Sequence, residues 1–299
     1  MNISIAMATY NGAKFLEAQL DSIAAQTRMP MELVICDDAS TDETINIIKA
    51  HILAPIIKLV VNPKNLGVVA SFKIAASLCH SKNYIAFCDQ DDIWHNNKLE
   101  ENFNAIVNFT NEKIPVLVYS DAVFIDASKN IINKSFMNET GIDKYQHVYQ
   151  TVLFGSIILG CSIMINPILR NYLLAMPDQL NFNHDAWMSL ICFSFGLCHF
   201  IQDPLLDYRK HDQNSTISNF EKKSSVNRLN IQLKAIFSEK QYLINEIELA
   251  KNILEKYETE FTSTKIRQIK KFIALEHRPY LYKKLYFEFV FLKYWKKRF

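Results

Sequence analysis

Short apolar runs alternate with amphipathic stretches along the first 120 residues of the chain. The apolar runs have the length of buried strands and lie at 3–8, 33–36, 59–61, 84–88 and 116–119. Between them, apolar residues recur at helical spacing over 13–26, 42–50, 68–80 and 97–109. Strand, loop and helix repeated in this order predict β-α-β units, and therefore an α/β fold with a mostly parallel sheet flanked by helices.

The pattern changes after residue 120. Residues 128–150 are polar and irregular, which predicts a mobile surface loop. A very apolar helix is expected to open at Asn183-His184-Asp185 and to run to Phe195. Helical spacing returns over 226–261 and 264–276. We therefore divide the chain into an α/β domain over 1–220 and a helical region over 221–299.

Polar residues follow three of the predicted strands. Thr9–Asn11 ends the first strand, Asp37-Asp38 ends the second and Asp89–Asp92 ends the fourth. Open α/β sheets bind their ligands at the carboxyl ends of the strands, which meet at one edge. We therefore expect these three turns to converge on a single site.

The segment Asp89–Asp92 holds three carboxylates within four residues. Carboxylates packed so closely repel one another and raise one another's pKa unless a cation lies among them. Closely spaced oxygen ligands suit a hard divalent ion, Mn²⁺ or Mg²⁺, which commonly shares substrate phosphates. For this segment taken alone, a solvated acidic turn is the alternative.

The formal net charge of +2 is divided unevenly along the chain. Residues 221–299 carry 18 Lys and Arg against 9 Asp and Glu, whereas residues 1–220 carry 15 against 22. The last 22 residues contain seven basic residues, one acid and nine aromatic residues, a composition typical of a helix that lies on a membrane surface. A helix packed on its own domain, with its lysines extending to solvent, is the alternative.

Other features exclude several kinds of site. Six cysteines without a C-x-x-C pair predict free thiols in a reducing compartment, and so a cytoplasmic protein. No apolar run reaches the roughly 18 residues of a spanning helix, and the N-terminus is too polar for a signal peptide. The absence of G-x-G-x-x-G and G-K-[ST] loops argues against dinucleotide and P-loop sites. We expect no nucleic-acid partner.

Six segments together resemble the family 2 glycosyltransferases of the GT-A fold, over about residues 1–215. In chain order they are Ala8-Thr9-Tyr10-Asn11, the D-D-x-S-x-D-x-T turn at 37–44, Asn65-Leu66-Gly67, Asp89-Gln90-Asp91-Asp92-Ile93-Trp94, His184-Asp185-Ala186-Trp187 and Tyr208–Ser215. The acidic segment has the form common among bacterial polysaccharide transferases, including rhamnosyltransferases.

The resemblance implies a GT-A domain that transfers a sugar, with inversion, from a dTDP- or UDP-sugar to a hydroxyl group. It implies donor contacts at Ala8, Thr9, Tyr10, Asn11, Asp38, Asn65, Gly67, Asp89 and Gln90. The implied ligands of Mn²⁺ or Mg²⁺ are Asp91, Asp89 and His211. Asp185 takes the position of the catalytic base. Acceptor contacts are assigned to Trp94, Gly160, Cys161, His184 and Trp187.

Several of these roles have plainer alternatives. Asp38 is also explained as an acid beside the N-terminus of a helix, and Asp185 as an acid in the first turn of one. His184 and Trp187 are also explained as residues of the core.

The basic aromatic end of the chain and the resemblance together suggest a place in the cell. We expect a glycan acceptor linked to polyprenyl diphosphate, on the cytoplasmic face of the inner membrane, in the synthesis of O-antigen or capsule. A homodimer through the helices after residue 226 is left open.

Two other functions compete with a transferase. A phosphohydrolase of the haloacid dehalogenase type also has D-x-D after a strand, but near the chain start and followed by Thr or Val, whereas Asp92 follows here. A non-catalytic, membrane-peripheral scaffold that binds sugar has no need of the full set of acids, all of which are present.

Overall fold

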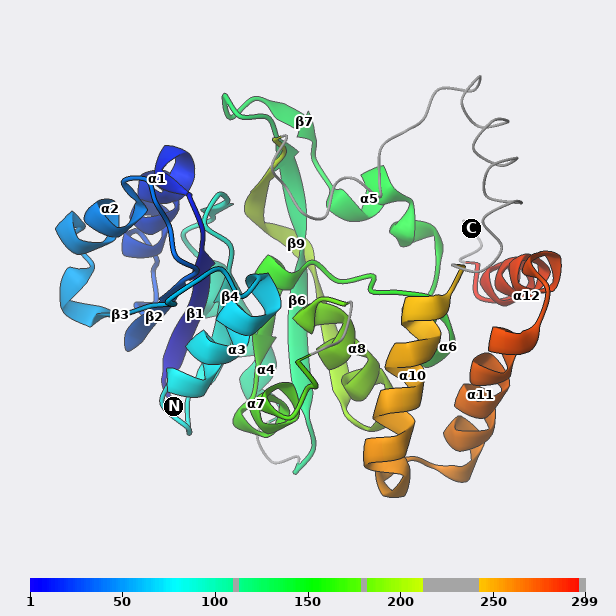
Figure 1. Ribbon diagram of the computed structural model, residues 1–299. Coiled ribbons are helices and arrows are strands. Elements are labelled where there is room, and N and C mark those ends of the chain that lie inside the picture. The colour runs from blue at the N-terminus through cyan, green and yellow to red at the C-terminus, as the bar shows by residue number, and fades with distance from the viewer. Residues whose placement is uncertain (110–112, 179–181, 212–241, 296–299) are drawn as a thin grey trace.

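The structure is a computed structural model that describes residues 1–109, 113–178, 182–211 and 242–295 (Figure 1). Its nine strands form one sheet in the order β3-β2-β1-β4-β8-β6-β9-β5, with β7 paired to β6. The strands are β1 (Ile3–Thr9), β2 (Glu32–Asp37), β3 (Ile57–Val61), β4 (Tyr84–Cys88), β5 (Ile93–Trp94), β6 (Val116–Ile125), β7 (Ile131–Asn133), β8 (Met164–Ile165) and β9 (Leu197–Arg209).

The two halves of the sheet differ in strand direction. In the first half, β1 pairs in parallel with both β2 and β4, and β2 pairs in parallel with β3. The short strand β8 then runs antiparallel between β4 and β6, while β9 runs parallel to β6. The predicted α/β fold with a mostly parallel sheet is confirmed, with antiparallel pairs confined to β5, β7 and β8.

Helices cover the sheet. The longer ones are α1 (Ala13–Ala24), α2 (Thr44–Ala50), α3 (Val68–Leu78), α4 (Lys98–Val107), α7 (Pro167–Leu174), α8 (His184–Phe195), α10 (Ile244–Tyr257), α11 (Ser263–Ile273) and α12 (Tyr280–Lys293). Helix α3 contacts β1, β2 and α7, whereas α4 contacts β6, β8 and β9. Each helix predicted in the first 110 residues is present, with ends that differ by a few residues.

The expectation of one irregular loop over 128–150 is wrong. Besides β7, this stretch contains α5 (Phe136–Thr140), η2 (Ile142–Lys144) and the start of α6 (Tyr149–Val152). Ser135 caps α5 by accepting a hydrogen bond from Asn138 N, and its hydroxyl donates to the buried Asp121. Local capping and one buried carboxylate therefore order a segment whose composition is that of a loop.

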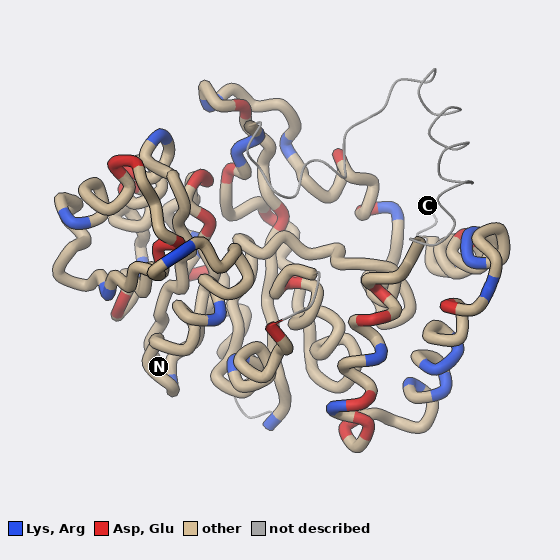
Figure 2. The backbone as a smooth tube through the Cα atoms, viewed as in Figure 1, with Lys and Arg blue, Asp and Glu red and all other residues tan. Residues whose placement is uncertain are grey.

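The three C-terminal helices lie together at the end of the molecule opposite α1 and α2 (Figure 1). Helix α10 packs on α8, and its Ile247, Ala250 and Ile253 are buried in the same hydrophobic core as the sheet. Lys and Arg positions are frequent along α11 and α12 (Figure 2). The part of the predicted helix at 226–241, and the predicted boundary at residue 220, lie outside the described residues.

A search of the described residues for a membrane span found no helix that is both long and apolar enough.

Candidate active site

The loops at the carboxyl ends of β1, β2, β3 and β4 border one cavity of about 600 Å³. Its walls are formed by Ala8, Thr9, Tyr10, Asn11, Asp38, Asn65, Gly67, Val68, Ser71, Asp89, Gln90, Asp91, Tyr208 and His211. All the residues that the sequence assigned to donor binding are among them, as are the three proposed metal ligands. The convergence follows from the topology, because parallel strands end at the same edge of the sheet.

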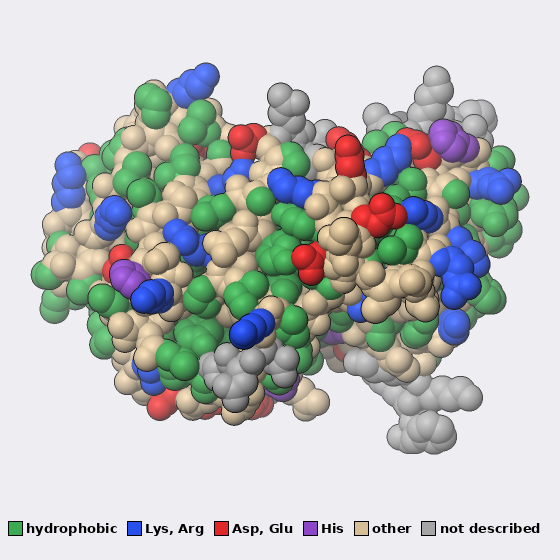
Figure 3. All heavy atoms as spheres, turned by 90° about the horizontal axis from the view of Figure 1, so that it is seen from below, with side chains coloured by type: hydrophobic (Ala, Val, Ile, Leu, Met, Phe, Trp, Pro, Cys, Tyr) green, Lys and Arg blue, Asp and Glu red, His purple; other side chains and the backbone are tan. Residues whose placement is uncertain are grey.

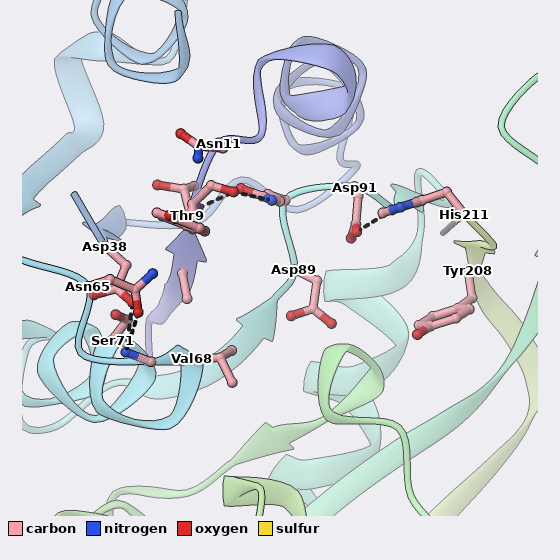
Figure 4. A pocket seen from close by; sticks show the side chains of 14 residues that line it. Thr9, Asn11, Asp38, Asn65, Val68, Ser71, Asp89, Asp91, Tyr208 and His211 are labelled. Carbon is pink, nitrogen blue, oxygen red and sulfur yellow. Dashed lines mark hydrogen bonds and ion pairs between the residues drawn. The ribbon is translucent and has the colours of Figure 1, made fainter. Parts of the chain in front are cut away.

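Asp38 anchors one end of the cavity (Figure 4). Its Oδ1 accepts hydrogen bonds from Asn62 Nδ2 and Leu66 N, each at 2.8 Å, and its Oδ2 accepts one from Gly67 N at 2.8 Å. Gly67 has φ +91°, a conformation that side chains other than glycine rarely adopt. The carboxylate therefore fixes the turn after β3, and Oδ2 retains a lone pair for a ligand.

Gln90 joins two of the loops. Its Oε1 accepts from Tyr10 N at 2.8 Å, and its Nε2 donates to Tyr10 O at 3.0 Å. The side chain passes so close to Gly12 that a Cβ there would lie 2.2 Å from Gln90 Oε1. Gln90 thus ties the turn after β1 to the acidic segment after β4. The ring of Tyr10 stays exposed at the rim of the cavity.

Asp91 and His211 face each other at the other end of the cavity (Figure 4). Asp91 Oδ2 lies 2.7 Å from His211 Nε2. These residues are 120 positions apart. They meet because β5, which follows the acidic segment, pairs with β9, whose Asp207 lies opposite Ile93.

A buried arginine holds this end together. Arg209 is 1% exposed, and its Nε donates to the backbone carbonyl of Asp91 at 2.8 Å. Its backbone N–H donates to Asp92 Oδ1 at 3.1 Å. The guanidinium lies over the ring of Phe15, 4.8 Å from its centroid, and the ring of His211 packs on the same phenylalanine. Arg209 therefore sets the position of both Asp91 and His211.

Asp89 lies in the middle of the cavity, between the Asp38 end and the Asp91–His211 pair (Figure 4). Burial, together with the nearby carboxylates of Asp91 and Asp185, raises the pKa of Asp89 to about 7. Asp185 is thus close enough to Asp89 for its charge to act on it, although the two are 96 positions apart.

Asp185 stands in the first turn of α8. Its Oδ1 accepts from Ala186 N at 2.7 Å, and the Ser156 side chain lies near enough to lower the pKa of this carboxyl. Burial nevertheless raises the pKa of Asp185 to about 6. Gly160 lets the chain before β8 approach this turn, because a Cβ there would lie 3.2 Å from the His184 ring and 3.9 Å from Asp185 Cβ.

The comparisons with known proteins agree with this geometry. A family model described as "Glycosyl transferase family 2" matches residues 4–152. The chain belongs to this family. The match covers the strands β1, β2, β3 and β4 with the loops that border the cavity. In this glycosyltransferase, Asp38 and the acidic segment lie within the matched residues, whereas Asp185 and His211 lie beyond them.

The individual relatives share only about a quarter of their residues with this chain. The "dTDP-rhamnosyl transferase RfbG" of Shigella flexneri is 26% identical over 243 residues, which cover 75% of this chain and 78% of the relative. The "UDP-Glc:alpha-D-GlcNAc-diphosphoundecaprenol beta-1,3-glucosyltransferase WfgD" of Escherichia coli is 27% identical over 196 residues, 63% of this chain and 69% of that protein. Among solved structures, S. aureus TarS 1–349 in complex with UDP has a TM-score of 0.57 at 14% identity, covering 96% of this chain and 92% of TarS 1–349. The likeness to TarS supports the fold of the glycosyltransferase.

Several groups in or near the cavity could bind a metal ion, and they differ in how well they suit one. Ligand atoms of Asp89, Asp92 and Cys161 lie within 4.8 Å of one another. Burial raises the pKa of Asp92 and of Cys161 well above their ordinary values, so both are poor ligands at neutral pH. Asp89, Asp91 and His211 face the cavity instead. Their oxygen and nitrogen donors fit a hard divalent ion better than buried sulfur does.

Both tryptophans assigned to the acceptor lie in the hydrophobic core instead. Trp94 is 1% exposed and packs against Lys98, whose Nζ lies 4.8 Å from the centroid of the indole ring. Trp187 is fully buried, and its Nε1 donates to Tyr172 O at 2.9 Å. Neither side chain reaches the cavity wall, so a direct contact between them and the acceptor is not supported.

His184 is also a packing residue. Its ring lies between Phe72 and Phe87, with centroid distances of 4.3 and 5.1 Å, and neither ring nitrogen has a partner among the described residues. Burial lowers the pKa of His184 to about 3, so the ring is neutral at physiological pH. Cys161 is likewise buried behind Asp89. Of the five acceptor residues assigned from the sequence, Gly160 is the one whose backbone lies against the first turn of α8, next to Asp185.

The sequence analysis missed several residues of the site. Ser71 and Val68 line the cavity from α3, and Tyr208 lines it from β9. Ser156 lies beside Asp185, in an apolar stretch that carries no motif. Tyr208 and Arg209 stand beside His211 in one of the six segments, and that adjacency was the available signal.

Proposed function

We propose that this chain is an inverting, metal-dependent transferase that moves a sugar from a dTDP- or UDP-sugar to a hydroxyl group of a glycan. One observation carries the proposal. Asp89 lies at the centre of the cavity, with the Asp91–His211 pair on one side and the charge of Asp185 within reach. Transfer requires a donor diphosphate beside metal ligands such as Asp91 and His211, and an acceptor hydroxyl beside a base such as Asp185.

The Asp38 end is the proposed nucleoside pocket. Asp38 Oδ2 accepts one hydrogen bond, from Gly67 N, and has capacity for the N3–H of a uracil or thymine ring. Tyr10 stands at the rim with its ring exposed, in a position to stack on the base. Thr9 and Asn65 line the same end of the cavity and offer polar contacts to the ribose.

The acidic end is the proposed diphosphate pocket. Asp91, Asp89 and His211 would hold Mn²⁺ or Mg²⁺, which neutralises the charge that develops on the leaving nucleoside diphosphate. Arg209 keeps Asp91 and His211 in position, because its Nε donates to the Asp91 carbonyl and its backbone N–H donates to Asp92 Oδ1. The network of Arg209 and Phe15 thus pre-orients the ligands before the donor arrives.

Asp185 is the proposed general base. A base that removes the proton of the acceptor hydroxyl on the face opposite the leaving group gives a single displacement with inversion. Burial raises the pKa of Asp185 to about 6, so that it is ionised at neutral pH and yet more basic than an exposed aspartate. The bond from Ala186 N orients the carboxylate.

The relatives guide the choice of acceptor. The name of the E. coli protein WfgD specifies a diphosphoundecaprenol-linked sugar, and that of RfbG specifies a dTDP-rhamnosyl donor. By this likeness we propose a lipid-linked glycan acceptor and a role in the synthesis of bacterial surface polysaccharide. The six free cysteines of the chain are compatible with work in the reducing cytoplasm.

Calorimetry and a donor screen test the proposal. We expect UDP or dTDP to bind in the presence of Mn²⁺ and more weakly without it, and GDP to bind least. A panel of nucleotide sugars with Mn²⁺ or Mg²⁺ should then yield slow hydrolysis of one donor. Phosphate release from simple phosphoesters, without binding of any nucleoside diphosphate, would contradict the proposal.

A further inference from the structure

Helix α12 exposes a continuous apolar stripe. Leu281, Leu285, Phe289 and Leu292 are 65, 60, 66 and 68% exposed. Their spacing of three or four residues sets them on one face of the helix. Exposed hydrophobic residues elsewhere, such as Ile52 and the pair Ile131-Ile132, stand apart from one another along the chain. Scattered residues of that kind are normal, whereas a contiguous stripe marks a surface that is covered in use.

The opposite face of α12 is already occupied. Phe287 and Phe291 pack on Phe154, with ring centroids 5.2 and 5.7 Å apart. Phe291 also contacts Tyr145, at a centroid distance of 4.7 Å, and Gln146 N donates to Tyr294 O at 2.9 Å. The helix is therefore docked on the glycosyltransferase by its inner side, and the stripe faces outward because of this packing.

Basic residues border the stripe. At the helical repeat of 100° per residue, Lys284 falls on one side of the stripe and Lys293 on the other. Arg278 precedes the helix and is exposed, with its guanidinium 5.3 Å from the ring centroid of Tyr282. Glu288, the one acid of the helix, is exposed and by the same count falls between Lys284 and the stripe. In Figure 3 this end of the molecule carries Lys and Arg side chains beside hydrophobic ones.

We propose that the stripe Leu281–Leu292 on α12 docks on an anionic lipid surface, with the helix parallel to the membrane plane. An apolar face between basic residues, with Tyr282 and Trp295 beside it, is suited to the boundary between lipid headgroups and acyl chains. The 18 basic and 9 acidic residues of 221–299 add attraction to anionic headgroups. The same excess of charge disfavours a second copy of the chain as the occupant, because like charges would then face each other.

This surface has a structural link to the proposed catalytic base. Phe154, on which the inner face of α12 packs, precedes Ser156 by two residues, and the Ser156 side chain lies beside Asp185. A helix that rests on lipid thus supports the segment beside the base. Lipid binding itself does not depend on the proposed reaction, so it is measured with no donor or acceptor present.

Tryptophan fluorescence of the unmodified protein gives the first test. The chain has three tryptophans, of which Trp94 and Trp187 are buried and Trp295 is 45% exposed. Vesicles of phosphatidylcholine with phosphatidylglycerol should shift the emission to the blue, whereas pure phosphatidylcholine should do so much less, and added salt should reverse the shift. The variant Trp295→Phe should lose the shift. A shift that persists in Trp295→Phe, or is equal with both lipids, overturns the proposal.

Vesicle flotation of full-length variants gives the second test. Leu285→Ser with Phe289→Ser should weaken partitioning to anionic vesicles by roughly 10–100-fold, since two apolar side chains lose their burial in lipid. The matched control, Ile131→Ser with Ile132→Ser, removes two exposed apolar side chains from another part of the surface and should bind as wild type. Equal flotation of the two double variants contradicts the proposal.

Sedimentation without lipid separates lipid docking from self-association. If the stripe is an interface between two copies, the wild type is a dimer in buffer and the Leu285→Ser, Phe289→Ser variant is a monomer. That result would overturn lipid docking. Equal sedimentation of the two proteins, with loss of flotation only in the variant, supports it.

Discussion

Two groups of aspartates at the same edge of the sheet differ in how well their charges are satisfied. Asp37 and Asp38 stand at the end of β2, and each accepts three hydrogen bonds from side chains or backbone. Asp92, after β4, has one bond, from Arg209 N, and an Oδ2 without a partner among the described residues. Asp37 and Asp38 have the hydrogen bonds that a buried carboxylate needs, whereas Asp92 lacks them.

This difference separates acids that stabilise the fold from acids that are candidates for a role in the reaction. Burial raises the pKa of Asp89 to about 7 and that of Asp185 to about 6. Groups with perturbed pKa values in a cavity are candidates for chemistry, because an arrangement that costs stability persists where function requires it. Substitution of Asp38 should therefore mainly lower stability. Substitution of Asp185 or Asp91 should mainly lower activity.

The largest effect is expected for Asp185→Asn. Turnover should fall by about 10²–10⁴, the range for loss of a general base, while nucleoside diphosphate binding is retained. The melting temperature should stay the same or rise, since a buried charge is removed. Initial rates, calorimetry and thermal unfolding measure these three quantities.

The control for this variant is Asp203→Asn, which removes an exposed carboxylate from β9 outside the cavity wall. It should keep the turnover of the wild type. Wild-type turnover in Asp185→Asn would remove this residue from the mechanism.

The pH dependence of the rate gives the next effect. A base has to be ionised, and the pKa of Asp185 is raised to about 6. Below that pH, kcat should therefore fall by about tenfold per pH unit, and above it kcat should level off. Asp185→Asn should lack this acid limb in its residual activity. Rates between about pH 5 and about pH 8 at saturating donor and Mn²⁺ test this; a flat profile in the wild type would contradict it.

Thermal stability should depend on both pH and metal. In the metal-free protein the pKa of Asp89 is raised from the ordinary 3.8 to about 7 by burial and then by Asp91 and Asp185. Between these values the folded state keeps a proton that the unfolded chain has lost, so stability falls as the pH rises. At a pH above about 7, Mn²⁺ at 100 times its Kd should raise Tm by roughly 5 °C. At acidic pH the rise should be smaller.

Asp91→Asn should reduce this stabilisation by Mn²⁺, because it removes a charged ligand. Asp143→Asn, a change in the distant η2 turn, is the matched control and should respond to Mn²⁺ as the wild type does. An equal rise of Tm in all three proteins would show that Mn²⁺ binds elsewhere.

The smallest effect on chemistry is expected for Asp38→Asn. Three N–H donors point at this carboxylate, and an amide group would set its own donor against at least one of them. The free energy of unfolding should fall by about 1–3 kcal/mol, and UDP should bind about tenfold more weakly. Denaturant unfolding and calorimetry measure both. Unchanged stability would show that the hydrogen bonds of Asp38 are not needed for the fold.

The succession of strands and helices along the first 120 residues, and the edge of the sheet that forms the cavity, were predictable, because short apolar runs and their polar ends are local features. The same holds for Asp38, Asp89 and Asp91, which stand directly after strands. His211 was predictable from the resemblance alone. Nothing local to the sequence shows that β5 pairs with β9 and so brings His211 to Asp91.

The sequence by itself determined which residue types are available at each strand end, since the alternation of apolar and polar positions is written along the chain. The tertiary structure decided which of them face the cavity. Trp94 and Trp187 were assigned to the acceptor but are buried, whereas the leucines of α12 are exposed because Phe287 and Phe291 pack the other face of the helix on Phe154. Burial and the pKa shifts of Asp89 and Asp185 arise from neighbours distant in sequence. Packing between such segments depends on the whole fold, and the order of residues in one segment does not encode it.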